Sequence, residues 1–326
     1  MMNTAIRLID HSAVRLAGPL AGLCCAAIFL ATLDAPAVGA AFSRVAWWWL
    51  APMLVLGCVN LWLRAIRWGV LLAPAAPLPT AQLLRVGLAA ALAGLGLPAR
   101  GGDLVKMLLA ARLPGVKLAD VAAAELLERL VDGAIFGAFI AGAAVLGGVA
   151  GWPLFLGLGT LGIYLPILAA VPIAGWYLGA PFERACEQRA RGWHPRRLIG
   201  WAADAAYRRG PSLLAHAARL SLLAWAAEAA SYYCLLVAFG WLAPPILPFA
   251  AVGVANFAFA VPGAPASVGT FHLPISSLLV DSFGAEPSLA SAFAVALHVG
   301  VLAPVPLLWA LLTARSRLQA APIRAR

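Results

Sequence analysis

Long apolar runs alternate with short polar breaks along almost the whole chain. A helix needs about 20 mainly apolar residues to span the roughly 30 Å hydrocarbon core of a bilayer, and six runs reach or approach that length. They predict membrane-spanning helices at residues 16–33, 45–63, 118–147, 153–178, 213–241 and 289–312. The second of these is followed by Arg64, Arg67 and Trp68, which favour an interfacial anchor on the cytoplasmic side.

Two further apolar stretches are interrupted by helix breakers. Residues 83–97 form a run of about fifteen residues, which is too short to cross comfortably. A break at 98–103 and a short amphipathic piece at 104–113 follow it. The second unit covers residues 246–280 and breaks at 262–269. Broken backbone is tolerated at membrane depth only where protein or water satisfies its hydrogen bonds, so both units are predicted to be re-entrant hairpins.

The order of elements repeats, since each half reads span, span, broken hairpin, span. The halves are residues 16–147 and 153–313 of a single transmembrane domain, 1–326. Because three crossings separate them, the second hairpin enters from the opposite face of the membrane. Inverted repeats with broken helices are typical of transporters that bind a polar substrate near the midplane. The predicted fold is therefore all-α: a polytopic membrane protein with about six transmembrane helices and two re-entrant hairpins in an inverted repeat.

The composition is that of a membrane protein. Hydrophobic residues make up 63% of the chain and charged residues 11%, whereas about 25% of residues are charged in soluble domains. The net charge of +10 comes from basic residues between the apolar runs, which favours positive-inside loops over a nucleic-acid surface. The arginine-rich loop at 181–211 is predicted to be cytoplasmic, as are both termini. The five cysteines show no CxxC spacing, so neither a metal site nor a cofactor is expected.

The predicted helix at 118–147 carries a charged stripe. Its members follow the spacing i, i+3, i+4, i+7, which places them on one helix face: Glu125, Glu128, Arg129 and Asp132. Each ionisable side chain near the bilayer centre costs about 2.5–3.5 kcal/mol on insertion scales, so such residues are by default a functional site. An internal ion-pair network that fixes helix packing is the competing interpretation. Glu125 and Arg129 have the favourable i, i+4 order, and three acids also require a second cation, for which Lys106 and Arg100 are candidates.

The hairpin breaks supply further candidates for substrate binding. A half-helix N-terminus concentrates unpaired N–H groups and about +0.5 charge, which suits a phosphate. Gly102 and Gly269 would let the backbone approach such a group closely. Asp103 and Lys106 either bind a head group or cap and anchor a surface helix.

Four residues outside the stripe complete the candidate binding site, each with a second interpretation. Arg67 is either a ligand contact or part of the interfacial anchor. Glu228, in the predicted helix at 213–241, either pairs with a donor from a hairpin or carries a proton. His272 and His298 either titrate near neutral pH or are hydrogen-bonded packing residues.

Four segments together resemble a known membrane family. They are RAIRWGVLL at 64–72, LPARGGDLVKMLL at 97–109, ELLERLVD at 125–132 and PASVGTFH at 265–272. In this order they are similar to the flippase-like family that includes the membrane region of lysylphosphatidylglycerol synthases, over roughly residues 45–313. Family members often carry Glu and Arg where this chain has Asp103 and Lys106, and an acid where it has His272. These departures bear on the identity of the head group.

The resemblance implies an integral inner-membrane protein that moves or handles lipid head groups. Membrane lipids, and an anionic phospholipid above all, are then the expected partners; nucleic acid is not, and a homodimer is left open. Some family members carry a separate aminoacyltransferase domain. That activity is not expected here, because fourteen residues follow Leu312.

The leading hypothesis is lipid translocation. Arg129 and Lys106 would pair with the lipid phosphate, and the two halves would rock to expose it to either leaflet. One alternative is a membrane-embedded lipid-modifying enzyme with Glu128 or Asp132 as general base. Against it, the chain contains no HExxH and no GxSxG motif. The other alternative is an accessory subunit of a lipid-synthesis complex.

Overall fold

The structure is a computed structural model that describes residues 12–73, 77–97, 101–188, 195–260, 267 and 269–320. Every regular element among these residues is helical. Five helices in the described part are long and apolar enough to cross a membrane, and a bent pair of helices raises the number to six. The five are Trp47–Leu72, Asp120–Leu146, Trp152–Ala170, Ser212–Ala238 and Pro287–Ala314. The prediction of an all-α polytopic membrane protein is therefore confirmed.

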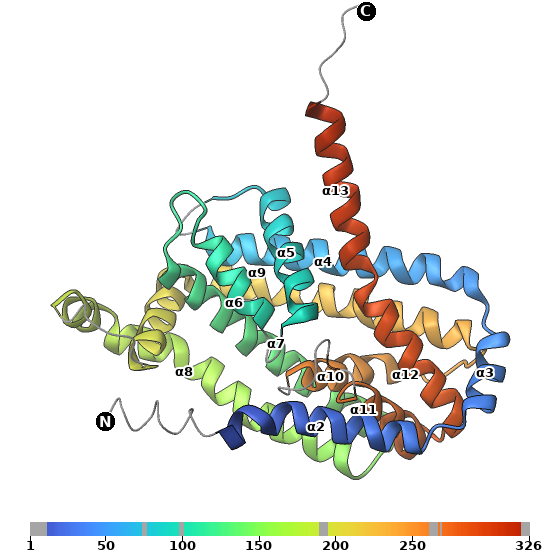
Figure 1. Cartoon of the computed structure of the whole chain (residues 1–326). Coiled ribbons are helices and arrows are strands. Elements are labelled where there is room, and N and C mark those ends of the chain that lie inside the picture. The colour runs from blue at the N-terminus through green and yellow to red at the C-terminus, as the bar shows by residue number, and fades with distance from the viewer. Residues whose placement is uncertain are drawn as a thin grey trace, which may run out of the picture.

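Two long helices, α4 (Leu50–Leu72) and α9 (Pro195–Ala238), run side by side (Figure 1). α9 is interrupted at Gly210, whose φ of 70° lies outside the helical region. α7 (Leu118–Leu146) packs against α9, α8 (Trp152–Gln188) and α4. This arrangement brings the charged stripe of α7 next to two other membrane helices.

The first membrane segment is bent. α2 (Ser12–Ala31) and α3 (Ala35–Ser43) meet at an angle of 82°. The Thr32 hydroxyl donates a hydrogen bond back into the end of α2, and the carboxylate of Asp34 caps the first turn of α3. The sequence predicted the span at 16–33 but no helix directly after it, because the capping role of these polar residues was not recognised.

The second membrane helix extends further than predicted. α4 continues past residue 63 to Leu72, so Arg67 lies within the helix, and its side chain is 0% exposed. The interpretation of Arg67 as an interfacial anchor is therefore wrong. An arginine can be buried here because α7 supplies carboxylates to pair with it, and the hydropathy of α4 alone contains no information on that partner.

Each predicted hairpin consists of short helical pieces that contact one another. They are α5 (Thr80–Gly96) and α6 (Gly101–Ala110) in the first hairpin, and α10 (Leu247–Ala260), α11 (His272–Ser277) and the π-helix η3 (Leu278–Ser282) in the second. Residues 98–100 and 261–266, in the breaks, lie outside the described residues, as do most side chains of the basic loop at 181–211. The inverted relation between the two halves stays a prediction.

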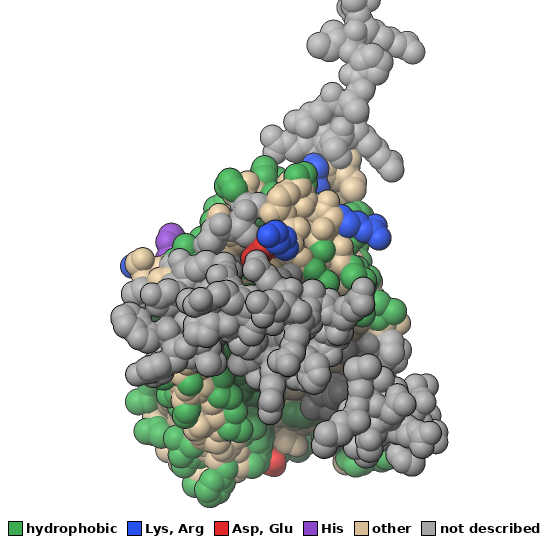
Figure 2. Space-filling model, turned by 90° about the vertical axis from the view of Figure 1, so that its left-hand side faces the viewer, with side chains coloured by type: hydrophobic (Ala, Val, Ile, Leu, Met, Phe, Trp, Pro, Cys, Tyr) green, Lys and Arg blue, Asp and Glu red, His purple; other side chains and the backbone are tan. Residues whose placement is uncertain are grey.

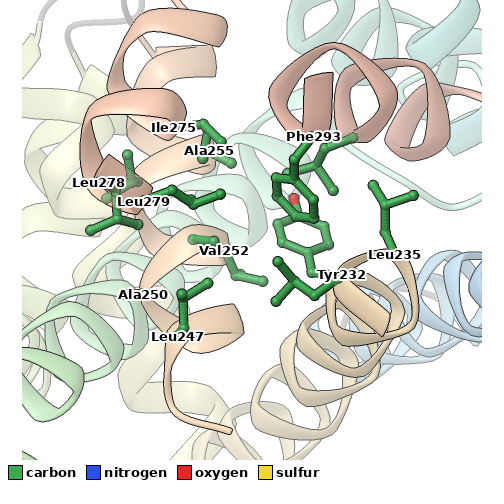
Figure 3. Close-up of a cluster of buried hydrophobic side chains, with 14 of the residues drawn as sticks. Tyr232, Leu235, Leu247, Ala250, Val252, Ala255, Ile275, Leu278, Leu279 and Phe293 are labelled. Atoms are coloured by element: carbon green, nitrogen blue, oxygen red, sulfur yellow. The ribbon is translucent and has the colours of Figure 1, made fainter. Parts of the chain in front are cut away.

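A large hydrophobic cluster joins the second hairpin to α9 and α12 (Pro287–Leu302) (Figure 3). Tyr232 of α9, Leu278 of η3 and Phe293 of α12 are fully buried in this cluster. α13 (Pro304–Ala320) leads away from this core (Figure 1). The second hairpin is therefore fixed by close apolar packing on several sides.

Hydrophobic side chains cover much of the described surface that Figure 2 shows, with few charged side chains among them. Leu146, Phe155 and Leu223 are among the large apolar residues that are exposed. Exposed apolar surface of this kind is expected where a protein faces lipid. The exterior therefore agrees with a location inside the bilayer.

Gly157 marks a close contact between α8 and α7. A Cβ at this position would fall on the backbone of Ala141, whose Cα is only 2.8 Å away. We expect Gly157→Ala to push the two helices apart at a cost of about 1–3 kcal/mol in unfolding free energy, and to lower the melting temperature in detergent. Gly159→Ala is the matched control, because nothing lies within 4 Å of its added carbon. Equal melting temperatures for the two variants would contradict this packing.

Candidate functional site

Arg67 lies at the centre of a buried ion-pair network between α4, α7 and α9. Its guanidinium contacts Glu128 and Asp132, each at 2.6 Å, and donates a hydrogen bond to the Ser221 hydroxyl at 2.6 Å. Asp132 also accepts a hydrogen bond from the indole N–H of Trp225 at 2.7 Å. Because both carboxylates are only 2% exposed, these charges neutralise one another away from solvent. This part of the stripe matches the ion-pair interpretation.

Lys106 connects α6 to the same stripe. Its ammonium nitrogen contacts Glu125 at 2.5 Å and Glu128 at 3.4 Å, and lies 4.3 Å from the centroid of the Trp68 ring. Lys106 is thus the cationic neighbour that the excess of acids required. Because Lys106 forms an ion pair with Glu125, the predicted i, i+4 pair between Glu125 and Arg129 is not formed.

Arg129 pairs with Asp103 of α6 instead, at 2.9 Å. The two side chains are 32% and 39% exposed, so water reaches this pair. Partly solvated pairs contribute little to stability and exchange partners easily. Arg100, the other cation that we expected beside the stripe, lies outside the described residues.

A cavity of about 300 Å³ lies against these ion pairs. Its wall includes apolar side chains, among them Leu61 of α4 together with Leu84 and Leu88 of α5. The charged and amide side chains at the wall are Arg64, Asp103, Lys106, Glu128, Arg129 and Asn256. The cavity is therefore lined by aliphatic side chains together with three cations and two carboxylates.

Arg64 differs from the other cations at this wall. Its guanidinium carbon lies 5.1 Å from the centroid of the Trp225 ring, which is a cation–π contact. Among the described side chains no carboxylate oxygen lies within 4.0 Å of it. From the sequence, Arg64 was expected only as an interfacial anchor, whereas in the structure it lines the cavity.

Several uncharged residues of the site were not predicted from the sequence. Trp68 is 1% exposed and lines the cavity, and its indole nitrogen has no hydrogen-bond partner among the described groups. The i, i+4 spacing of Arg64 and Trp68 placed both on one face of α4 and was the available signal. Ser221, Trp225 and Asn256 come from α9 and α10, and nothing local in the sequence connects them to the stripe.

The two candidate glycines make close helix contacts. A Cβ at Gly102 would lie 3.1 Å from the Cα of Gly94, where α5 and α6 cross, and Gly102 also lines the cavity. Gly269 has a φ of 87°, which favours glycine, and an added Cβ there would fall on the backbone of α2 at Gly22 and Ala26. Thus the backbone at Gly269 approaches a helix, and not the open space that a phosphate needs.

His272 and His298 form a pair away from the cavity, and neither lines it. Nε2 of His272 lies 3.2 Å from Nδ1 of His298, and Nδ1 of His272 accepts a hydrogen bond from the N–H of Gly269 at 3.4 Å. The rings of Phe29 and Phe271 stack on them. No group of three or more potential metal ligands exists in the described part of the chain. The geometry agrees with the packing interpretation of both histidines.

Glu228 of α9 is 9% exposed. Its Oε1 accepts a hydrogen bond from the Tyr232 hydroxyl at 2.9 Å. No cation among the described side chains lies within 4.0 Å of this carboxylate. Among the described residues of the two hairpins no donor pairs with Glu228, whose hydrogen-bond partner comes from the same helix.

Comparison with known proteins gives one match. The sequence model described as the lysylphosphatidylglycerol synthase TM region matches residues 15–308. No curated protein and no solved structure matches the chain. The matched residues include the whole ion-pair network and the cavity described above.

Proposed function

The chain belongs to the family of the lysylphosphatidylglycerol synthase transmembrane region, and on this premise we propose that it binds the head group of an anionic phospholipid and moves the lipid between leaflets. Membership makes the chain a multi-pass membrane protein related to lipid modification or translocation. The proposal adds the substrate class, the movement, and an inner-membrane location with both termini in the cytoplasm.

The observation that carries the proposal is the mixed wall of the cavity. Arg64, Lys106 and Arg129 contribute three cations to this wall, and aliphatic residues of α4 and α5 contribute apolar surface. A phospholipid has the same two chemistries: a phosphate that accepts charge-assisted hydrogen bonds and chains that prefer apolar surroundings. A volume of about 300 Å³ suits a head group and leaves the acyl chains in the bilayer.

The ion pairs at the cavity wall suggest an order of contacts. Arg64 forms no ion pair within 4.0 Å with a described carboxylate that the phosphate would have to displace, so it receives the phosphate first. Arg129 follows by releasing Asp103, because their pair is partly solvated. Lys106 stays with Glu125 and Glu128, and its charge attracts the phosphate at longer range.

The geometry gives less support to the lipid-modifying enzyme. Glu128 and Asp132 both contact Arg67 at 2.6 Å, and a carboxylate held by a buried guanidinium is a poor general base. Asp132 does not line the cavity. A role in transport without chemical conversion is therefore part of the proposal.

Leaflet exchange in liposomes tests the proposed function. Pure protein is reconstituted with fluorescent phosphatidylglycerol, and dithionite then bleaches only the lipid that reaches the outer leaflet. We expect more bleaching than in protein-free liposomes. The molecular mass of the lipid should be unchanged, because no chemical conversion is expected. Arg129→Ala should slow exchange about tenfold, because the variant loses one charge-assisted hydrogen bond to the lipid phosphate.

Arg112→Ala is the matched control, since Arg112 is exposed just after α6, and it should exchange lipid like the unchanged protein. Conversion of the lipid to a product of different mass would favour the enzyme. Bleaching equal to that of protein-free liposomes would overturn the proposed function.

A further inference from the structure

Five charged side chains of the described part of the chain line the cavity, and four more, Arg67, Glu125, Asp132 and Glu228, are buried in α4, α7 and α9. Together they are four cations and five carboxylates. Three of the cations, Arg67, Lys106 and Arg129, contact four carboxylates on α6 and α7. Two charges remain outside these pairs, Arg64 and Glu228. The ionised cluster therefore contains one more negative charge than positive charges before any anion enters.

Glu228 and Arg64 are linked through Trp225. Arg64 stacks on the Trp225 ring, and Glu228 follows Trp225 by one helical turn on α9. The electrostatic interactions of Glu228 are attraction to Arg64 of α4 and repulsion from Asp132 of α7. Arg64 is thus the cation that compensates this buried carboxylate.

The other elements packed on α9 bring no further charge to Glu228 among their described side chains. α10 contains no titratable residue, the described side chains of α8 contain only Tyr164, and α12 contains His298, which pairs with His272. On α9 itself, Tyr232 donates its hydroxyl to Glu228. An anion at Arg64 would therefore leave Glu228 with no compensating cation.

We propose, on the basis of the proposed function, that a phosphate bound at Arg64 and a proton bound at Glu228 are coupled. The phosphate neutralises the cation that balances Glu228, and an uncompensated carboxylate in a buried site takes up a proton instead. The proton comes from bulk solvent and adds to the carboxylate, while the phosphodiester remains a monoanion. Coupling of this kind is reciprocal, so protonation of Glu228 also tightens lipid binding.

Titration calorimetry with short-chain phosphatidylglycerol tests the coupling. The full chain in detergent is titrated at one pH in two buffers of different ionisation enthalpy, whose heats give the number of protons exchanged. We expect each bound lipid to be accompanied by uptake of about one proton. Within the pH range in which Glu228 titrates, the affinity for the lipid should rise about tenfold when the pH is lowered by one unit.

Glu228→Gln mimics the protonated side chain and keeps an acceptor for Tyr232. We expect it to bind the lipid at least as tightly, without proton uptake or pH dependence. Asp281→Asn, which removes an exposed carboxylate of η3, is the matched control and should retain the uptake.

The outcomes separate the two proposals. Binding by the unchanged protein with identical heats in both buffers would overturn the coupling and leave the proposed function intact. Proton uptake that persists in Glu228→Gln would overturn the assignment to Glu228. Absence of any binding of phosphatidylglycerol would overturn both proposals. The buffer comparison needs only the unchanged protein, so the proposal stays falsifiable if the variant fails to fold.

Discussion

Arg67→Ala is expected to destabilise the protein by about 3–5 kcal/mol, the cost of breaking a buried ion pair by removing one partner. The substitution leaves Asp132 and Glu128 buried, and Asp132 then has no cation within ion-pair distance among the described side chains. Folded proteins have a total stability of about 5–15 kcal/mol. This single change therefore removes a large part of the free energy of unfolding.

The measurement is the melting temperature in detergent, together with the elution profile from size exclusion. Arg85→Ala is the matched control, since Arg85 is exposed on α5, and it should melt like the unchanged protein. Arg67→Lys should lie between the two, because an ammonium group keeps the charge but not the planar fork that reaches both carboxylates. A melting temperature unchanged in Arg67→Ala would show that the network does not stabilise the fold.

Arg64→Ala should weaken binding of short-chain phosphatidylglycerol about 10- to 100-fold, which corresponds to the 1.5–3 kcal/mol of a hydrogen bond to a charged group. The fold should tolerate this change, because Arg64 makes no ion pair among the described residues. Arg64→Ala should thus lower lipid affinity, whereas Arg67→Ala should lower stability, although Arg67 lies only three positions further along the same helix. The two variants separate a binding residue from a structural one.

Calorimetry measures this affinity, and melting temperature confirms that the variant is folded. Arg219→Ala removes an exposed arginine of α9 and serves as the matched control for net charge. Should Arg64→Ala and Arg219→Ala bind the lipid equally well, the phosphate does not contact Arg64.

Local sequence pattern was sufficient to predict the helices and the charged stripe. The spacing of Glu125, Glu128, Arg129 and Asp132 placed them on one face, and the surplus of acids predicted the nearby partner Lys106. Apolar run length predicted the membrane-spanning helices. All of these signals depend on neighbours in the sequence.

The remaining features depend on contacts between distant segments. Arg67 reaches Asp132 across 65 positions and Ser221 across 154, so its burial could not be read from α4 alone. The same holds for Gly269, whose backbone is covered by α2. For Arg64, an arginine at the end of an apolar run predicts an anchor as readily as a ligand contact, and only the cavity distinguishes the two.

Photo-crosslinking tests the central claim most directly, which is that an anionic lipid enters the cavity and binds at Arg64. A phosphatidylglycerol with a diazirine near the head-group end of one acyl chain is activated in membranes, and adducts are mapped by mass spectrometry. We expect adducts on Leu84 and Leu88 of the cavity wall, which disappear in Arg64→Ala. Adducts confined to Leu222 and Leu223, on the exposed surface of α9, would contradict it.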